Sequence, residues 1–162
     1  VSMFLKGLFG GGKAKKQILA PAEGKCVPMS EVNDPTFSQE ILGKGIAIIP
    51  AVGKVYAPAD GEVTMVFETK HALSVKTSDG AELIIHIGLD TVNLQGKYFN
   101  AHVAAGDKVK AGDLLMEFDI DKIKEAGYDV ITPVIVCNTP DYPNMVCHTG
   151  MDVKPGDVVI DL

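Results

Sequence analysis

The chain reads FETKHALSVKT from Phe67 to Thr77 and AELIIHIGLD from Ala81 to Asp90, with the tripeptide Ser78–Gly80 between them. Both segments alternate, though imperfectly, between apolar and polar residues. The Asp-Gly pair between them is a strong signal for a two-residue hairpin turn. The stretch therefore predicts a β-hairpin that carries His71 and His86, two of the four histidines in the chain.

The register of this hairpin decides whether the two histidines meet. With a two-residue turn at Asp79-Gly80, His86 lies opposite Leu73 and His71 lies opposite Gly88. The two imidazoles are then diagonal neighbours on one face, roughly 7–8 Å apart at the backbone. A three-residue turn would slip the register by one and put them on opposite faces. The predicted contact between the histidines thus depends on the turn assignment.

Length and composition indicate one soluble globular domain. The chain has 162 residues, of which 46% are hydrophobic and 22% are charged, which is enough to bury a substantial core. The formal charge of -6 argues against a nucleic-acid surface, because phosphate binding requires concentrated basic residues. It is compatible with a basic protein partner.

The first residues differ from the rest of the chain. We expect residues 1–17 to form a flexible segment and residues 18–162 to form a single domain. Residues 3–9 are apolar and are followed by three glycines and several lysines. Two interpretations of this start are a frayed terminus and a weak amphipathic membrane contact.

Repeated turn patterns predict an all-β fold. The pattern of residues 20–27 recurs at residues 57–63, each with a proline, an acidic residue and a glycine before a strand. Short strands separated by Gly-Asp turns are typical of a sandwich or barrel. Residues 130–137 and 158–162 are rich in β-branched residues and also read as strands. Pro133 within the first of these predicts an edge position or a bulge.

Helical signals are few. Residues 34–43 predict one short helix, with Phe37 and Ile41 on one face and Gly43 at its end. Residues 119–127 predict a second, capped by Asp119 or Asp121. The expected fold class is an all-β antiparallel sandwich with one or two short helical turns.

Two histidines on one face suit more than one chemistry. A neutral imidazole is a nucleophile, and a neighbouring imidazole can donate a hydrogen bond to charge that develops on it, as phosphoryl transfer through a phosphohistidine requires. Two imidazoles are also half of a zinc site, for which Asp90 is a further candidate ligand. The simplest alternative is two unrelated strand histidines. His102 and His148 lie in polar, loop-like surroundings and are interpreted as surface residues.

A family resemblance narrows these alternatives. The chain resembles the glucose-type enzyme IIA of the bacterial phosphoenolpyruvate-dependent sugar phosphotransferase system, over about residues 18–162. The resemblance is carried by four stretches, Gly45–Pro50, Ala57–Gly61, Phe67–Ser74 and Leu83–Val92. It implies a cytoplasmic β-sandwich of the duplicated-hybrid-motif type that serves as a phosphotransferase component.

The resemblance also implies roles for three residues. His86 matches the histidine that accepts a phosphoryl group from the phosphorylated histidine-containing phosphocarrier protein and passes it to a cysteine on the IIB domain of a sugar permease. His71 matches the second active-site histidine, whose ring hydrogen-bonds the phosphoryl oxygens. Thr69 matches the residue whose hydroxyl orients an imidazole. No cofactor is required for this chemistry, and zinc at His71 and His86 remains the metal alternative.

A partner surface follows from the same resemblance. It is an apolar patch ringed by acids, and Thr36 and Lys44 depart from the family pattern within it. The matching residues are Asp34, Phe37, Ile41, Phe67, Ile84, Asp90 and Val92. The alternative function is a regulatory binding module that docks on transporters or metabolic enzymes through this patch, according to its phosphorylation state.

Overall fold

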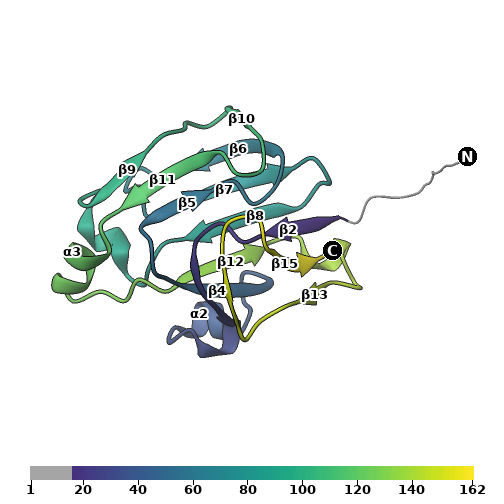
Figure 1. Cartoon of the computed structure of the whole chain (residues 1–162), viewed down its shortest axis with the longest axis horizontal. Coiled ribbons are helices and arrows are strands. Elements are labelled where there is room, and N and C mark those ends of the chain that lie inside the picture. The colour runs from purple at the N-terminus through teal and green to yellow at the C-terminus, as the bar shows by residue number, and fades with distance from the viewer. Residues whose placement is uncertain (1–15) are drawn as a thin grey trace, which may run out of the picture.

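An eight-stranded antiparallel sheet forms the largest part of the computed structural model, which describes residues 16–162 (Figure 1). Its order is β10-β6-β7-β8-β12-β4-β3-β14. The strands in chain order are β3 (Gly24–Pro28), β4 (Lys44–Pro50), β6 (Gly61–Val66), β7 (Ala72–Thr77), β8 (Glu82–His86), β10 (Lys108–Val109), β12 (Thr132–Val136) and β14 (Met151–Val153). The strand content confirms the all-β prediction.

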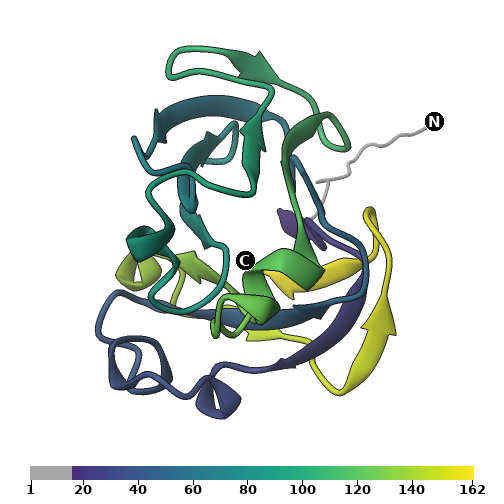
Figure 2. The same cartoon turned by 90° about the vertical axis from the view of Figure 1, so that its left-hand side faces the viewer.

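Two three-stranded antiparallel sheets complete the sandwich. One has the order β5-β11-β9 and contains β5 (Lys54–Tyr56), β9 (Phe99–Ala101) and β11 (Leu114–Phe118). The other has the order β13-β15-β2 and contains β2 (Gln17–Leu19), β13 (Val146–Cys147) and β15 (Val158–Asp161). The view in Figure 2 shows the sheets curving around the interior of the molecule.

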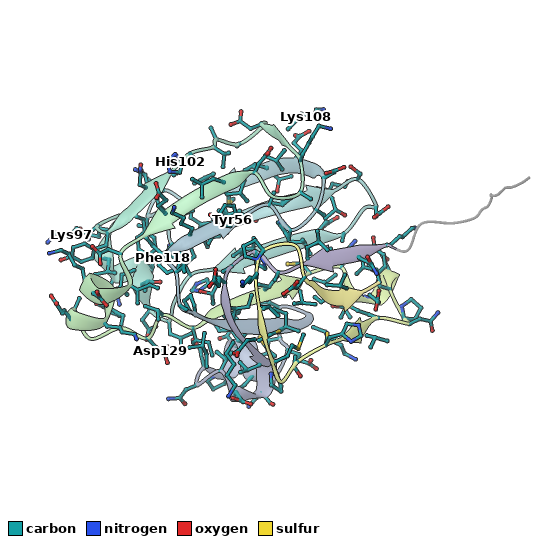
Figure 3. All side chains as sticks on the ribbon, in the orientation of Figure 1. Tyr56, Lys97, His102, Lys108, Phe118 and Asp129 are labelled. Carbon is teal, nitrogen blue, oxygen red and sulfur yellow. The ribbon has the colours of Figure 1, made fainter. Side chains whose placement is uncertain are left out.

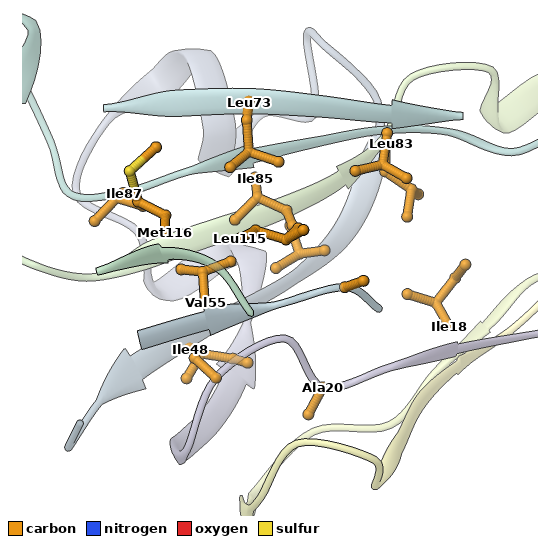
Figure 4. Close-up of a cluster of buried hydrophobic side chains, with 14 of the residues drawn as sticks. Ile18, Ala20, Ile48, Val55, Leu73, Leu83, Ile85, Ile87, Leu115 and Met116 are labelled. Carbon is orange, nitrogen blue, oxygen red and sulfur yellow. The ribbon is translucent and has the colours of Figure 1, made fainter. Parts of the chain in front are cut away.

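The main core lies between the large sheet and the β5-β11-β9 sheet. Leu73 of β7 and Ile85 of β8 are fully buried, and they pack in one cluster with Val55 and Leu115 from the opposite layer (Figure 4). Alternate residues of a strand point to opposite faces. Ser74, next to Leu73, therefore lies on the outer face of the sheet and is only half-buried.

A second, smaller core covers part of that outer face. The 3-10 helix η1 (Met29–Glu31) and helix α2 (Pro35–Ser38) lie over β4 and β12. The cluster consists of Val27, Met29, Val32, Phe37, Ala47, Leu89, Ile131 and Ile135. It packs Phe37 of α2 against residues of β4 and β12.

Helix α2 is shorter than predicted. The Asp34 carboxylate accepts a hydrogen bond from Thr36 N at 3.0 Å and caps the helix, with Pro35 in the favoured first position. The helix ends at Ser38 because the chain turns, with Glu40 at a positive φ of 57°. Ile41 therefore lies beyond the helix and not on its face.

Helix α3 (Ile120–Glu125) confirms the second predicted helix. Asp119 is its cap and accepts from Lys122 N at 3.0 Å. Ile123 is fully buried in the main core, and Gly127 follows the helix with a φ of 95°. The remaining 3-10 helices of the described chain are η2 (Thr91–Leu94) and η3 (Thr139–Asp141).

The predicted register of the β7–β8 hairpin was wrong by one residue. Ala72, not Leu73, lies opposite His86. The pairing ends at Thr77 and Ala81, where Thr77 N donates to Ala81 O at 2.9 Å and Ala81 N donates to Thr77 Oγ1 at 3.0 Å. The turn thus contains three residues, with Gly80 at a φ of 90°. This is the three-residue hairpin with glycine at the left-handed position.

The predicted edge position or bulge at Pro133 was also wrong. Strand β12 lies inside the large sheet, between β8 and β4, and its register with β4 is regular. Pro133 is the second residue of β12, and the pairing with β8 begins only at Val134. The proline, which has no N–H to donate, therefore lies just outside the ladder between β12 and β8.

The prediction of a flexible segment at residues 1–17 falls mostly outside the described residues, and both interpretations of residues 3–9, a frayed terminus and a weak membrane contact, lie outside them. Lys16 and Gln17 are described, and Gln17 is the first residue of β2. Between residues 16 and 162, no helix is long and apolar enough to cross a bilayer.

Candidate functional site

His71 and His86 lie against each other at one end of the β7–β8 hairpin. Their ring centroids are 4.9 Å apart and the rings are nearly perpendicular, at 82°. His86 is the last residue of β8 and is half-buried, whereas His71 immediately precedes β7 and is only 5% exposed. The predicted contact between the two histidines is present, although the register that predicted it is not.

The local backbone explains how His71 reaches His86. Lys70 N donates to Phe67 O at 2.7 Å, and Lys70 has a positive φ of 59°. This turn changes the chain direction immediately before His71, so His71 is not bound by the regular alternation of β7. Its carbonyl still accepts from Ile87 N at 2.7 Å, which ties the turn to the end of β8.

One hydrogen bond fixes the tautomer of His86. Its Nδ1 lies 2.8 Å from the backbone oxygen of Gly88. A carbonyl oxygen can only accept, so the hydrogen must be on Nδ1. In the neutral ring, the free electron pair is then on Nε2.

His71 has a side-chain partner instead. Its Nδ1 lies 2.7 Å from the hydroxyl oxygen of Thr69. A hydroxyl can donate or accept, so this contact is compatible with either tautomer of His71. When Thr69 donates, the hydrogen of the neutral ring is on Nε2 of His71.

Two phenylalanines enclose the imidazole pair. Phe37 packs on His86 with ring centroids 4.9 Å apart, and Phe67 contacts His71 edge-on at 5.4 Å. Phe37 is itself only 5% exposed because it belongs to the second core. The histidines therefore sit between rigid apolar side chains that limit access of water.

This environment keeps both imidazoles neutral. Burial, assisted by the neighbouring His86, lowers the pKa of His71 from 6.5 to about 4. Burial also lowers the pKa of His86 below 6.5. The hydrogen bond to Gly88 and the charges of Asp34 and Asp90 act in the opposite direction on the pKa of His86, but burial is the larger effect.

Gly88 is a residue of the candidate site that the sequence patterns did not single out. It has a positive φ of 79°, and a β-carbon at this position would lie 2.7 Å from the backbone oxygen of Asp129 and 2.6 Å from Cγ2 of Thr91. Only glycine fits both the conformation and the space. The available signal was a glycine two positions after a strand-end histidine.

Comparisons with known proteins identify the family. Residues 16–142 match the family model described as phosphoenolpyruvate-dependent sugar phosphotransferase system, EIIA 1. The glucose-specific EIIA component of Halalkalibacterium halodurans is 44% identical over 164 residues, covering 96% of this chain and 94% of the relative. The chain belongs to the glucose-type EIIA family.

Structural and fused relatives agree with this assignment. Glucose permease IIA from Mycoplasma capricolum superposes with a TM-score of 0.83 at 35% identity, covering 91% of this chain and 96% of that one. The β-glucoside-specific EIIBCA component of Bacillus subtilis is 52% identical over 149 residues. The aligned part spans 92% of this chain and only 24% of that longer relative.

The predicted partner residues of this EIIA chain differ in exposure. Ile41 is 66% exposed and Val92 is 46% exposed. Ile84 is half-buried on the same face of β8 as His86, two residues away. Phe67 is half-buried and Phe37 is buried. These two side chains therefore offer a partner protein less surface than Ile41 and Val92 do.

The two predicted acids are close enough to His86 to affect it. Asp34 caps α2, and Asp90, at a φ of 59°, precedes η2. Both charges raise the pKa of His86, against the effect of burial. Their predicted role as partner contacts stays a prediction.

The described residues do not complete a metal site. Across residues 16–162, no group of three or more His, Cys, Asp or Glu side chains is arranged to hold a metal ion. His71 and His86 are two potential ligands, and their Nδ1 atoms are already engaged by Thr69 and Gly88. Zinc at these histidines would therefore need further ligands from outside the described chain.

The other two histidines pair with acids elsewhere. His102 Nε2 lies 2.8 Å from Glu117 Oε1 (Figure 3). His148 Nε2 lies 2.7 Å from Asp161 Oδ2.

The depressed pKa of His71 predicts a pH dependence of stability. Between pH 6.5 and about 4, the unfolded chain binds more protons at His71 than the folded chain does. The free energy of unfolding is therefore highest above pH 6.5, and it falls as the pH is lowered from 6.5 towards 4, because protonation of His71 then favours the unfolded chain. We expect this residue to account for a loss on the order of 2 kcal/mol between pH 7 and pH 5.

Urea unfolding of the wild-type protein and His71→Gln at both pH values measures this contribution. The variant should lose less stability than the wild-type protein on acidification. Equal losses would contradict the depressed pKa.

Proposed function

We propose that this EIIA domain is a cytoplasmic phosphocarrier in sugar uptake, with His86 as the phosphoryl acceptor. The donor is the phosphorylated histidine-containing phosphocarrier protein, and the acceptor is the cysteine of a permease IIB domain. The observation that carries the proposal is the bond from His86 Nδ1–H to Gly88 O. It leaves the electron pair of the neutral ring on Nε2.

Loading of His86 exchanges one nitrogen–phosphorus bond for another. The electron pair on Nε2 attacks phosphorus, the bond to the donor imidazole breaks, and its electron pair returns to the donor. The phosphorylated His86 ring keeps its Nδ1 hydrogen and carries a positive charge. The hydrogen bond to Gly88 O stabilises that charge, because the carbonyl dipole points at the charged ring.

Unloading follows the same logic in reverse. The thiolate of the IIB cysteine attacks phosphorus, and the bond to Nε2 breaks with its electron pair returning to His86. The ring leaves as a neutral imidazole. It is a good leaving group because the electron pair from the broken bond neutralises its positive charge. The low pKa of His86 favours this neutral product.

His71 supplies charge stabilisation in this proposal. With the Thr69 hydroxyl donating to Nδ1, the Nε2–H of His71 is available to a phosphoryl oxygen next to His86. Its near-complete burial strengthens such a bond, because water does not compete for it. Thr69 is then the residue that selects the useful tautomer of His71.

The surface around His86 suits partner docking. Ile41 and Val92 expose large parts of their side chains, and Asp34 and Asp90 add negative charge near His86. Apolar contacts with an acidic rim fit a basic protein partner. The fused EIIBCA relatives support a IIB domain as a second partner of the same surface.

A regulatory function through the same patch is the second candidate, favoured by the exposure of Ile41 and Val92. Phosphate on His86 would add negative charge to the patch and oppose docking on a regulated transporter or enzyme.

No step of the proposed reaction requires a cofactor, and the two histidines alone do not provide a closed zinc site.

The first prediction from the proposed function tests His86 as the phosphoryl acceptor. Incubation with phosphoenolpyruvate, enzyme I and the phosphocarrier protein should place an acid-labile phosphate on the wild-type chain. His86→Gln, which lacks the nucleophilic nitrogen, should take up none. His102→Gln is the matched control and should be labelled normally, since His102 pairs with Glu117 away from the imidazole pair. Phosphate that persists in His86→Gln, measured by mass spectrometry, would refute the assignment.

The second prediction separates loading from unloading. His71→Gln should still accept phosphate but should pass it to a purified IIB domain about tenfold more slowly or worse, because a stabilising donor is missing. Thr69→Val, which keeps the shape and removes the hydroxyl, should slow transfer in the same direction. Rapid-quench kinetics measure both rates. Normal onward transfer in His71→Gln would be incompatible with this role.

The third prediction concerns the docking surface. Ile41→Ser should raise the KM for the phosphorylated carrier protein about tenfold, since a few residues of an interface carry most of its binding energy and Ile41 is the most exposed of the predicted apolar contacts. Ile49→Ser is the matched control, because Ile49 is 43% exposed but lines a separate pocket with residues of β3 and β14. An unchanged KM in Ile41→Ser would remove Ile41 from the interface.

A further inference from the structure

Asp129 lies in the segment that connects α3 to β12 (Figure 3). Gly127 ends the turn after the helix, and the chain then passes next to the end of β8 before β12 begins. Leu89 N donates to the backbone oxygen of Asp129 at 3.0 Å, and Gly88 N donates to Ile131 O at 3.0 Å. These two bonds join the connecting segment to the residues that follow His86.

The Asp129 side chain closes this segment on itself. Its Oδ1 accepts from Ile131 N at 2.9 Å. This bond spans two residues and fixes the backbone of residues 129–131 in a turn. Both carbonyls that hold Gly88 and Leu89 belong to this turn, at Asp129 and Ile131.

The turn therefore bears directly on the position of the Gly88 carbonyl. Gly88 is held at its N–H by Ile131 O, and its α-carbon packs closely against the backbone oxygen of Asp129. The carbonyl of the same residue accepts the Nδ1–H of His86 at 2.8 Å. A shift of the turn would move that carbonyl and loosen the imidazole.

We propose that Asp129 is a positioning residue for phosphoryl transfer at His86, acting through the Ile131 N–H and the Gly88 carbonyl. The proposal rests on the proposed function of His86. Asp129 does not touch the phosphoryl group; its carboxylate keeps the acceptor of the Nδ1 hydrogen in place. By analogy with the hydrogen-bond partners that orient metal-bound histidines, whose removal commonly lowers activity about tenfold or more, we expect an effect of similar size here.

The hydrogen-bond acceptor, and not the charge, is what Asp129 contributes. Asp129→Asn retains an oxygen at the same position and should transfer phosphate within about twofold of the wild-type rate. Asp129→Ala should lower kcat about tenfold with little change in KM, because the partner surface is unaltered. Asp129→Glu, whose oxygen is displaced by one methylene, should show an intermediate loss and replaces Asp129→Ala if that variant does not fold.

Asp119→Ala is the matched control. Asp119 also closes a side-chain bond to a backbone N–H, at 3.0 Å to Lys122 N, but it caps the start of α3. Its removal should lower stability without changing kcat. An equal loss of kcat in Asp119→Ala and Asp129→Ala would reduce the effect to general destabilisation and overturn the proposal.

Nitrogen-15 NMR of the unphosphorylated protein gives a readout that does not depend on activity. In the wild-type protein and Asp129→Asn, His86 should be a single tautomer with its hydrogen on Nδ1. In Asp129→Ala the second tautomer should become populated. An unchanged His86 tautomer in Asp129→Ala would overturn the proposal, whatever its kcat.

The same measurements separate the two hypotheses. If the wild-type chain is not phosphorylated on His86, the proposed function fails, whereas the tautomer spectra of the Asp129 variants still test the positioning effect. If phosphorylation occurs and the spectra do not respond to Asp129→Ala, only the role of Asp129 fails.

Discussion

The hydrogen bond from His86 Nδ1 to the Gly88 carbonyl is the constraint on which the arrangement of the site depends. It requires the strand to end at His86, so that the chain can turn back within two residues. That turn requires a positive φ, which glycine provides at Gly88. The carbonyl must then be held from outside the hairpin, and the segment before β12 does this through its bonds to Gly88 and Leu89. The position of the Gly88 carbonyl therefore depends on the end of β8 and on the segment between α3 and β12.

Burial and charge act against each other at this pair of imidazoles. Phe37 and Phe67 exclude water and favour the neutral rings, whereas Asp34 and Asp90 favour protonation of His86. Burial is the larger effect, so His86 is available as a nucleophile. The acids act instead when the ring becomes positively charged, which in the proposed reaction occurs on phosphorylation. The same carboxylates then attract the positively charged ring and repel the negatively charged phosphoryl oxygens.

The sequence predicted the fold class and the histidine pair, but not the geometry that joins them. Turn signals and β-branched runs identified strands that proved to be β12 and β15, and the cap of α3 is Asp119, one of the two residues predicted for it. Asp79-Gly80 suits both two-residue and three-residue turns, and the deciding bond, from Ala81 N to the Thr77 hydroxyl, is not visible in a pattern of side-chain polarity. Gly88 and Asp129 were missed for a similar reason. Gly88 binds His86 through its backbone carbonyl and Asp129 binds the backbone N–H of Ile131, whereas periodicity describes only where side chains point.

The enclosure of His86 has a kinetic consequence. The imidazole is half-buried, and Phe37 packs on one side of it while His71 packs on another. A macromolecule that donates to Nε2 and one that receives from it must cover the same small area, so they cannot be bound together. In the proposed function, exchange through this domain is therefore of the ping-pong type, and a free phosphorylated form is released between the two encounters. An excess of either partner in its spent state would compete with the other and slow the flow of phosphate.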